Sequence, residues 1–275
     1  MISSLVISQS ELDKLILAVK VNHGFDFSGY AMTSFSRRIY RFLEKNKLAG
    51  IDHLVTKLKS EDTFFEYFLN EVTVNTTDLF RDPGFWKRFK KKILPKLAKL
   101  DEINIWHAAC SSGEEVVSMA ICLKEAGLLD KTNFLATDIN NEILDVAQST
   151  KYHKWRLPQY EKNYKEFEGE KSLSDYYEIE DGKLNFDDSL TRNVKYKNFN
   201  LTLDTNFSKY DMILCRNVLI YFTKSQQEQV IEMLSNSIEG KGYLVLGAQE
   251  SITWHRTADN FLAVSNDWKI YKKIR

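Results

Sequence analysis

The stretch INIWHAACSSGEEVVSMAICLKEAG, residues 103–127, decides the fold. A short apolar run typical of a buried strand leads into a turn of small residues, and apolar residues at helical spacing follow. Three more strand-like runs come later, NFLATDI (133–139), YDMILC (210–215) and GYLVLGA (242–248), with the helical segments 140–148 and 225–240 among them. This alternation predicts an α/β domain with a mostly parallel sheet that helices cover on both faces.

Polar residues at the helix starts can cap the free backbone N–H groups there. The caps that we expect are Ser10, Asn140, the capping box of Ser112 and Glu115, and the pair of Ser225 and Glu228.

Two segments depart from the alternation. The C-terminal FLAVSNDWKIYKKI, residues 261–274, predicts an antiparallel hairpin at an edge of the sheet. Residues 151–200 predict a small antiparallel β insertion, in which 151–167 are helical or irregular and both 176–186 and 193–199 supply short strands.

From Ser10 to about Lys99 the apolar residues recur at helical spacing without a convincing strand. We therefore expect a helical N-terminal domain at residues 1–90, followed by an α/β domain at 91–275.

Charge is unevenly distributed along the chain. Residues 1–99 hold 17 Lys and Arg against 11 Asp and Glu, and the remainder holds 21 against 27. In SFSRRIYRFLEKNK, residues 34–47, Arg37 and Arg41 stand four apart with Arg38 beside them, which predicts a basic helix face. Such a face suits an acidic partner, although an ordinary solvated surface would look the same.

The composition excludes several classes of protein. With 43% hydrophobic residues and only 11 Gly and 3 Pro, the chain of 275 residues is not a disordered one. It has neither a secretory signal nor ~18 consecutive apolar residues, so we expect a soluble cytoplasmic protein. Cys110, Cys122 and Cys215 lack CxxC spacing, so we expect free thiols, no disulfide framework and no metal.

Ligands of doubly wound folds lie at the carboxyl ends of the strands, next to the turn after the first strand. Here Gly113 is the only glycine of that turn, and Glu114 and Glu115 would repel a pyrophosphate but could hold a cationic amine. Asp138 ends the second strand, where carboxylates bind a ribose. These features favour S-adenosylmethionine over NAD, although acids at a helix start can simply complement its dipole.

Several motifs together resemble one family. NEVTVNTTDLFRD, AACSSGEE, ATDINNEIL, KNFNL, CRNVLIYF and GYLVLGAQES occur in this order between about residues 70 and 252. They are similar to the CheR family of chemotaxis receptor methyltransferases. The resemblance implies a class I methyltransferase domain, Rossmann-like with an antiparallel C-terminal hairpin, preceded by an all-α domain. It also implies methyl transfer from S-adenosylmethionine to glutamate side chains of chemoreceptors, with S-adenosylhomocysteine as product.

The site residues follow from the same resemblance. It implies that Arg81 and Tyr221 are catalytic and that aromatic residues of the segment 75–86 line the cofactor crevice. Ala109 replaces a glycine that is common in the family, which is acceptable if the backbone there keeps a negative φ. The cofactor-binding residues implied are Asn75, Thr77, Arg81, Ala109, Glu114, Asp138, Ile139, Asn200, Leu201, Cys215, Arg216 and Asn217.

The resemblance further implies a partner. Arg37, Arg38 and Arg41 would dock onto the acidic helical cytoplasmic domain of a chemoreceptor, and the protein would be a monomer. Some family members also bind a receptor-tail peptide through a β-subdomain loop with glycines, for which this chain offers only Gly169 and Gly182.

Two other functions fit the same residues: methylation of a protein outside chemotaxis, and a non-catalytic adaptor that binds the cofactor. A nucleic-acid methyltransferase fits less well, because the C-terminal part is acidic.

Overall fold

The computed structural model describes residues 7–60, 62–206 and 208–275. It divides into two compact units, Met1–Val74 with Ile220–Glu228 and Asn75–Leu219 with Gln229–Arg275. The division falls after Val74 and not near residue 90. The physical reason is that Phe85, Trp86 and Phe89 are fully buried in the hydrophobic core of the second unit.

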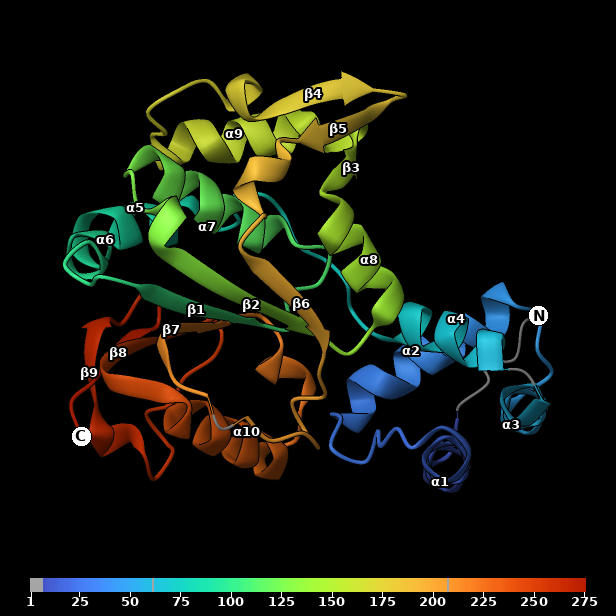
Figure 1. The fold of residues 1–275 in the computed structure, drawn as a ribbon. Helices are drawn as coiled ribbons and strands as arrows, with labels where there is room; N and C mark the ends of the chain where they lie inside the picture. The colour runs from blue at the N-terminus through green and yellow to red at the C-terminus, as the bar shows by residue number, and fades with distance from the viewer. Residues whose placement is uncertain (1–6, 61, 207) are drawn as a thin grey trace. The chain divides into compact units, whose positions relative to one another are not determined.

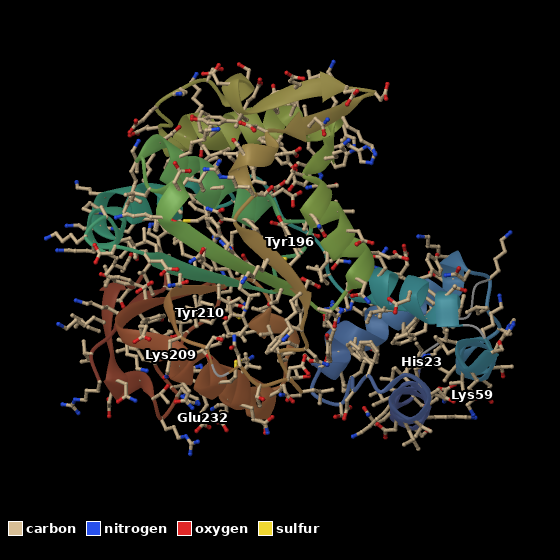
Figure 2. The ribbon with its side chains drawn as sticks, in the orientation of Figure 1. His23, Lys59, Tyr196, Lys209, Tyr210 and Glu232 are labelled. Atoms are coloured by element: carbon tan, nitrogen blue, oxygen red, sulfur yellow. The ribbon has the colours of Figure 1, made fainter. Side chains whose placement is uncertain are left out.

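Within residues 7–60 and 62–74, the first unit contains α1 (Gln9–His23), α2 (Met32–Lys45), α3 (Ile51–Ser60) and α4 (Asp62–Val72). Aromatic rings form much of its core: the Phe27 ring stacks on Phe35 at 4.7 Å and meets the edge of Phe68 at 6.1 Å. His23 in Figure 2 belongs to α1 and stacks on Phe65 with 4.0 Å between ring centroids. No helix in the described ranges is long and apolar enough to cross a membrane.

The second unit is built on a seven-stranded sheet of order β6-β2-β1-β7-β8-β10-β9. Its first five strands are parallel, and β10 and β9 form the expected antiparallel hairpin at the edge. The α/β class is therefore confirmed. The strands are β1 (Ile103–Ala108), β2 (Thr132–Asp138), β6 (Val194–Asn198), β7 (Tyr210–Cys215), β8 (Ile238–Leu246), β9 (Phe261–Ser265) and β10 (Ile270–Lys273).

Helices cover both faces of this sheet, with α7 and α10 on opposite sides in Figure 1. Residues 116–123 of α7 are all buried, as in a helix that is enclosed by its neighbours. The helices that include residues of this unit are α5 (Pro83–Lys92), α6 (Leu94–Leu97), α7 (Glu114–Glu125), α8 (Asn141–Ser149), α9 (Leu157–Phe167) and α10 (Lys224–Asn236). The short 3-10 turns are η1 (Leu129–Lys131), η2 (Lys154–Arg156), η3 (Leu173–Tyr176), η4 (Asp188–Leu190), η5 (Leu219–Tyr221) and η6 (Ala258–Asn260).

The expected β insertion is present, and the two strands expected at 176–186 are confirmed, but its third strand is not the one expected. A small antiparallel sheet of order β3-β5-β4 contains β3 (Lys151–His153), β4 (Tyr177–Glu180) and β5 (Lys183–Phe186). The expected strand at 193–199 instead forms β6, which pairs in parallel with β2. It joins the large sheet because Val194 and Tyr196, the latter marked in Figure 2, pack on the buried cluster around Cys110.

Three expected helix caps are wrong and one is confirmed. The Asn140 side chain accepts from the Ile143 N–H at 3.3 Å, as expected. The cap of α1 is Ser8 and not Ser10. Ser225 lies inside α10, where Thr223 Oγ1 accepts the N–H of Gln226.

The third wrong cap is the box of Ser112 and Glu115. The start of α7 is Gly113, whose φ of +86° turns the chain so that no side chain caps the helix. Glu115 is thereby free to pair with other groups.

Candidate cofactor-binding site

The carboxyl ends of β1 and β2 meet at Asp138. Its Oδ2 accepts from the N–H of Ser111 at 2.9 Å and its Oδ1 from the N–H of Asn140 at 3.1 Å. Burial raises the pKa of this carboxyl group above its ordinary value. The side chain is 8% exposed, so the acid is fixed in place at the turn where a ribose was expected.

The turn after β1 has an unusual backbone. Ala109, Ser111 and Gly113 have φ values of +61°, +52° and +86°, so the negative φ that would make alanine acceptable in place of the family's glycine is not found at Ala109. The neighbouring strand β2 helps to hold the turn in this conformation, because the Cys110 N–H donates to Thr137 O at 2.8 Å. The hydroxyl of Ser111 is buried and has no hydrogen-bond partner, which fits a site that completes its bonding with a ligand.

A second corner of the site lies where β6 ends beside β2. The Asn198 amide donates to Ile139 O at 2.8 Å, and the Phe199 N–H donates to Asp138 O at 2.9 Å. These bonds place the next two residues, Asn200 and Leu201, beside the same strand end. Asp138, Ile139, Asn200 and Leu201 thus lie around the same strand end, and their binding of an adenosine stays a prediction.

Glu114 is completely buried at the start of α7. Its carboxylate accepts from Ser112 Oγ at 2.6 Å, from the hydroxyl of Tyr160 at 2.9 Å and from Arg156 Nη1 at 2.8 Å. Burial raises the pKa of Glu114, while Ser112 and Arg156 act in the opposite direction. Arg156 and Tyr160 did not emerge from the sequence, because nothing in an irregular segment relates them to a turn some 40 residues earlier.

The segment 75–82 is a loop that the second unit holds from several sides. The N–H of Phe80 donates to Ser118 Oγ at 2.8 Å, Asn163 Nδ2 donates to Leu79 O at 2.9 Å, and Arg156 Nη1 donates to Thr77 O at 2.8 Å. The bond to Arg156 brings Thr77 close to Glu114.

The aromatic residues of this region do not line an open crevice. Phe80 and Phe85 are 0% exposed, and Phe80 stacks on Phe167 of α9 at 4.6 Å. They belong to the core cluster of the unit and anchor the loop, which corrects the expectation from the resemblance.

Arg81 lies at the end of this anchored loop and is partly exposed. Its Nη1 donates to Thr76 O at 3.0 Å, and its backbone carbonyl accepts from Trp86 Nε1 at 3.0 Å. It forms no ion pair within the described ranges, so its charge is available to an incoming anion.

The arginine after β7 is held by two partly buried carboxylates. Arg216 Nη2 pairs with Asp82 at 2.7 Å and Nη1 with Glu115 at 2.9 Å, and its guanidinium lies 4.5 Å from the centre of the Phe85 ring. Cys215 is completely buried. Arg216 therefore ties the end of β7 to both the loop and α7.

Glu250 is a further residue that sequence reasoning missed. Its carboxylate accepts the backbone N–H groups of Asn217 at 3.0 Å, Leu219 at 2.7 Å and Gly247 at 2.6 Å. Asn217 has a φ of +62°, so this buried acid holds another strained turn next to the site. The motif GYLVLGAQES contained it, but no pattern indicated its bonds.

The remaining expected residues belong to the first unit. Tyr221 ends η5, and the Arg38 guanidinium lies 5.2 Å from the centre of its ring. Nε and Nη2 of Arg38 are buried without a hydrogen-bond partner, and burial lowers its pKa. Arg37 and Arg41 are exposed on α2, so Arg38 differs from them in its surroundings.

Comparison with known proteins covers most of the chain. Residues 75–270 match the family described as CheR methyltransferase, SAM binding domain, and residues 10–73 match the CheR methyltransferase all-alpha domain. A protein of Pseudomonas putida named as a candidate methyltransferase, Cher3, is 34% identical over 96% of both chains. A chemotaxis protein methyltransferase of Listeria monocytogenes is 28% identical over 91% of this chain and 92% of its own. The solved structure of the N-methyltransferase NodS of Bradyrhizobium japonicum is 12% identical with a TM-score of 0.40, over 72% of this chain and 90% of its own, a likeness too remote to bear on function.

Proposed function

Because the chain belongs to the CheR family of S-adenosylmethionine-dependent methyltransferases, we propose that it methylates glutamate side chains of chemoreceptors. The products are glutamate methyl esters and S-adenosylhomocysteine. The relative of Listeria monocytogenes that is named a chemotaxis protein methyltransferase supports this choice of acceptor.

One observation carries the proposal: two buried acids flank a strained turn at the strand ends. Asp138 and Glu114 are 8% and 0% exposed, and Ser111 between them has a buried hydroxyl without a partner. A ribose diol and an ammonium group are the complements of these two acids. Asp138 would hold the ribose and Glu114 the amino group, with Asn75 and Thr77 at the methionine end and Asn200 and Leu201 beside the adenine. The bound cofactor supplies an electrophilic methyl group on a sulfonium.

The acceptor needs no general base. A glutamate carboxylate has an ordinary pKa of ~4.3 and is already ionised at neutral pH. The protein has to remove water from it and aim one oxygen at the methyl carbon along the axis of the bond to sulfur. Positioning of this kind can contribute ~7 to 11 kcal/mol.

Arg81 is the group best suited to hold that carboxylate. Its guanidinium has no acidic partner among the described residues, and an arginine can hold a carboxylate by charge-assisted hydrogen bonds. The Tyr221 hydroxyl would orient the acceptor with one further hydrogen bond. The exposed cations Arg37 and Arg41 on α2 would meet the acidic helices that carry the target glutamates, with Arg38 contributing from its position beside Tyr221.

The direct test incubates the protein with S-adenosylmethionine, labelled in the methyl group, and with membranes that contain chemoreceptors. We expect label in the receptor that is released as methanol by mild base, which is the mark of a methyl ester. Label in another protein of the same preparation would point to a different acceptor. Absence of any transfer, with cofactor binding intact, would favour a non-catalytic adaptor.

Replacing Arg81 by alanine separates chemistry from cofactor binding. We expect Arg81→Ala to lower turnover by about 100-fold or more, since a misplacement of ~1 Å between the reacting atoms can cost about that factor. The affinity for S-adenosylhomocysteine in calorimetry should change far less. The matched control is Arg88→Ala on α5, and unchanged turnover in Arg81→Ala would remove Arg81 from the mechanism.

A further inference from the structure

Arg156 lies at the centre of the contacts around Glu114. It ends η2 and precedes α9, and its Nη1 donates to Glu114 Oε1 at 2.8 Å, to Thr77 O at 2.8 Å and to the hydroxyl of Tyr160 at 3.3 Å. One nitrogen thus connects the acid at the start of α7 with the loop at 75–82.

The guanidinium lies 5.2 Å from the centre of the Trp155 ring, and its Nε and Nη2 make no hydrogen bond in the described structure. All the hydrogen bonds of Arg156 in the described structure go to Nη1, and neither Nε nor Nη2 is among the buried nitrogens without a partner. The side chain is 23% exposed. Nε and Nη2 carry three N–H groups in one plane, the arrangement that binds a carboxylate through two parallel bonds.

The adjacent charges of Glu114 and Arg156 match the two charges at the amino-acid end of the cofactor. Glu114 and Arg156 present a carboxylate and a guanidinium side by side, with 2.8 Å between the contacting atoms. The amino-acid end of S-adenosylmethionine carries an ammonium and a carboxylate on one carbon atom. A fixed acid beside a fixed base is complementary to that zwitterion, whereas either group alone would recognise only half of it.

We propose that Arg156 binds the carboxylate of the cofactor's amino-acid end through Nε and Nη2, while Glu114 binds the ammonium. The proposal rests on the proposed function, because it takes the cofactor to be S-adenosylmethionine. It makes Arg156 a specificity-determining residue, which selects a cofactor with an intact amino acid. The bonds from Nη1 to Glu114 and Thr77 hold the guanidinium in position for this contact.

The test compares two ligands by calorimetry. One is S-adenosylhomocysteine, and the other is its decarboxylated analogue, which keeps the amine and lacks only the carboxylate. We expect the wild-type protein to prefer S-adenosylhomocysteine. Arg156→Gln should weaken the binding of S-adenosylhomocysteine by about 10- to 100-fold, as for the loss of hydrogen bonds between charged groups, and should change that of the analogue by less than about threefold.

Two further variants keep the test decisive. Arg156→Lys retains a positive charge beside Glu114 but loses the planar fork, so it should also lose preference for S-adenosylhomocysteine. Lys154→Gln removes an exposed charge from the same turn and should leave both affinities unchanged. Thermal unfolding of each variant checks that the protein folds.

The outcomes distinguish the two proposals. If the wild type binds S-adenosylhomocysteine and Arg156→Gln weakens both ligands equally, Arg156 only supports Glu114 and the inference is overturned, while the proposed function stands. The same conclusion follows if the wild type does not discriminate between the ligands. If the wild type binds neither S-adenosylmethionine nor S-adenosylhomocysteine, the proposed function fails and this inference fails with it.

Discussion

Ala109 holds a φ of +61°, in the left-handed region that costs a residue with a Cβ roughly 1 to 2 kcal/mol. Ala109→Gly removes this strain and costs about 0.5 to 1 kcal/mol through the more flexible unfolded chain. We therefore expect the free energy of unfolding to rise by about 0.5 to 1 kcal/mol in denaturant titrations. Ala108→Gly, in the neighbouring position of β1, is the matched control and should lower it.

Asp138 gives the second prediction at this scale. If its carboxylate binds the ribose, Asp138→Ala should weaken S-adenosylhomocysteine binding in calorimetry by about tenfold or more, as for a lost hydrogen bond to a charged group. Asp145→Ala removes an exposed acid from α8 nearby and should leave the affinity unchanged. An unaltered affinity in Asp138→Ala would contradict the assignment of the ribose.

Single residues differ in how far the sequence reveals them. Asp138 was predictable because it ends an apolar strand, and Asn140 because a capping side chain acts on the next turn of its own helix. Arg156 and Glu250 were not, since their partners are distant in the chain and are defined only by packing. The φ of Ala109 also escaped, because alanine is not a residue that signals a left-handed backbone.

At the scale of elements, the site depends on how firmly the loop 75–82 is tied to the sheet. Arg216 provides the charged connection, with ion pairs to Asp82 and Glu115 and only 4% of its side chain exposed. Glu115 continues the network, since its Oε1 lies 2.9 Å from His107 Nδ1. The neighbours Arg216 and Asn217 are thus fixed by separate sets of acids, and the strand end cannot shift without breaking both.

Arg216→Met tests this connection. Removing one partner of a buried ion pair leaves the other charge unpaired, so we expect the free energy of unfolding to fall by about 3 to 5 kcal/mol. Arg192→Met breaks an exposed pair with Asp130 and should cost less than about 1 kcal/mol. Equal effects of the two substitutions in denaturant unfolding would show that Arg216 contributes no more than a surface charge.

The same scale explains the errors in strand assignment. The parallel strands β1, β2, β7 and β8 were predicted from their apolar runs. The strand β3 has three residues, too few for a periodic pattern, so it was missed within a segment expected to be helical or irregular. The strand β6 was recognised, but its place in the large sheet was not, because alternation of side chains identifies a strand and not the strand that it pairs with.

At the scale of the whole molecule, the distribution of charge affects how fast the protein associates with a charged partner. Residues 1–74 hold nine Lys and Arg against nine Asp and Glu, so the excess of positive charge found in residues 1–99 lies entirely in residues 75–99. On α2 the positive charge is local, with Arg37 and Arg41 exposed on the helix. Opposite charges on two partners speed their encounter, and salt weakens this effect. Methylation of an acidic receptor should therefore slow as salt is added, with the change mainly in KM.

Charge reversal localises the docking surface. Arg41→Glu should raise KM for the receptor severalfold and reduce its dependence on salt, while the affinity for S-adenosylhomocysteine stays the same. Lys59→Glu, at an exposed position of α3 marked in Figure 2, makes the same change of charge in the same unit and should have little effect. If the two variants raise KM equally, the receptor responds to net charge and not to α2; if neither does, docking takes place on another surface.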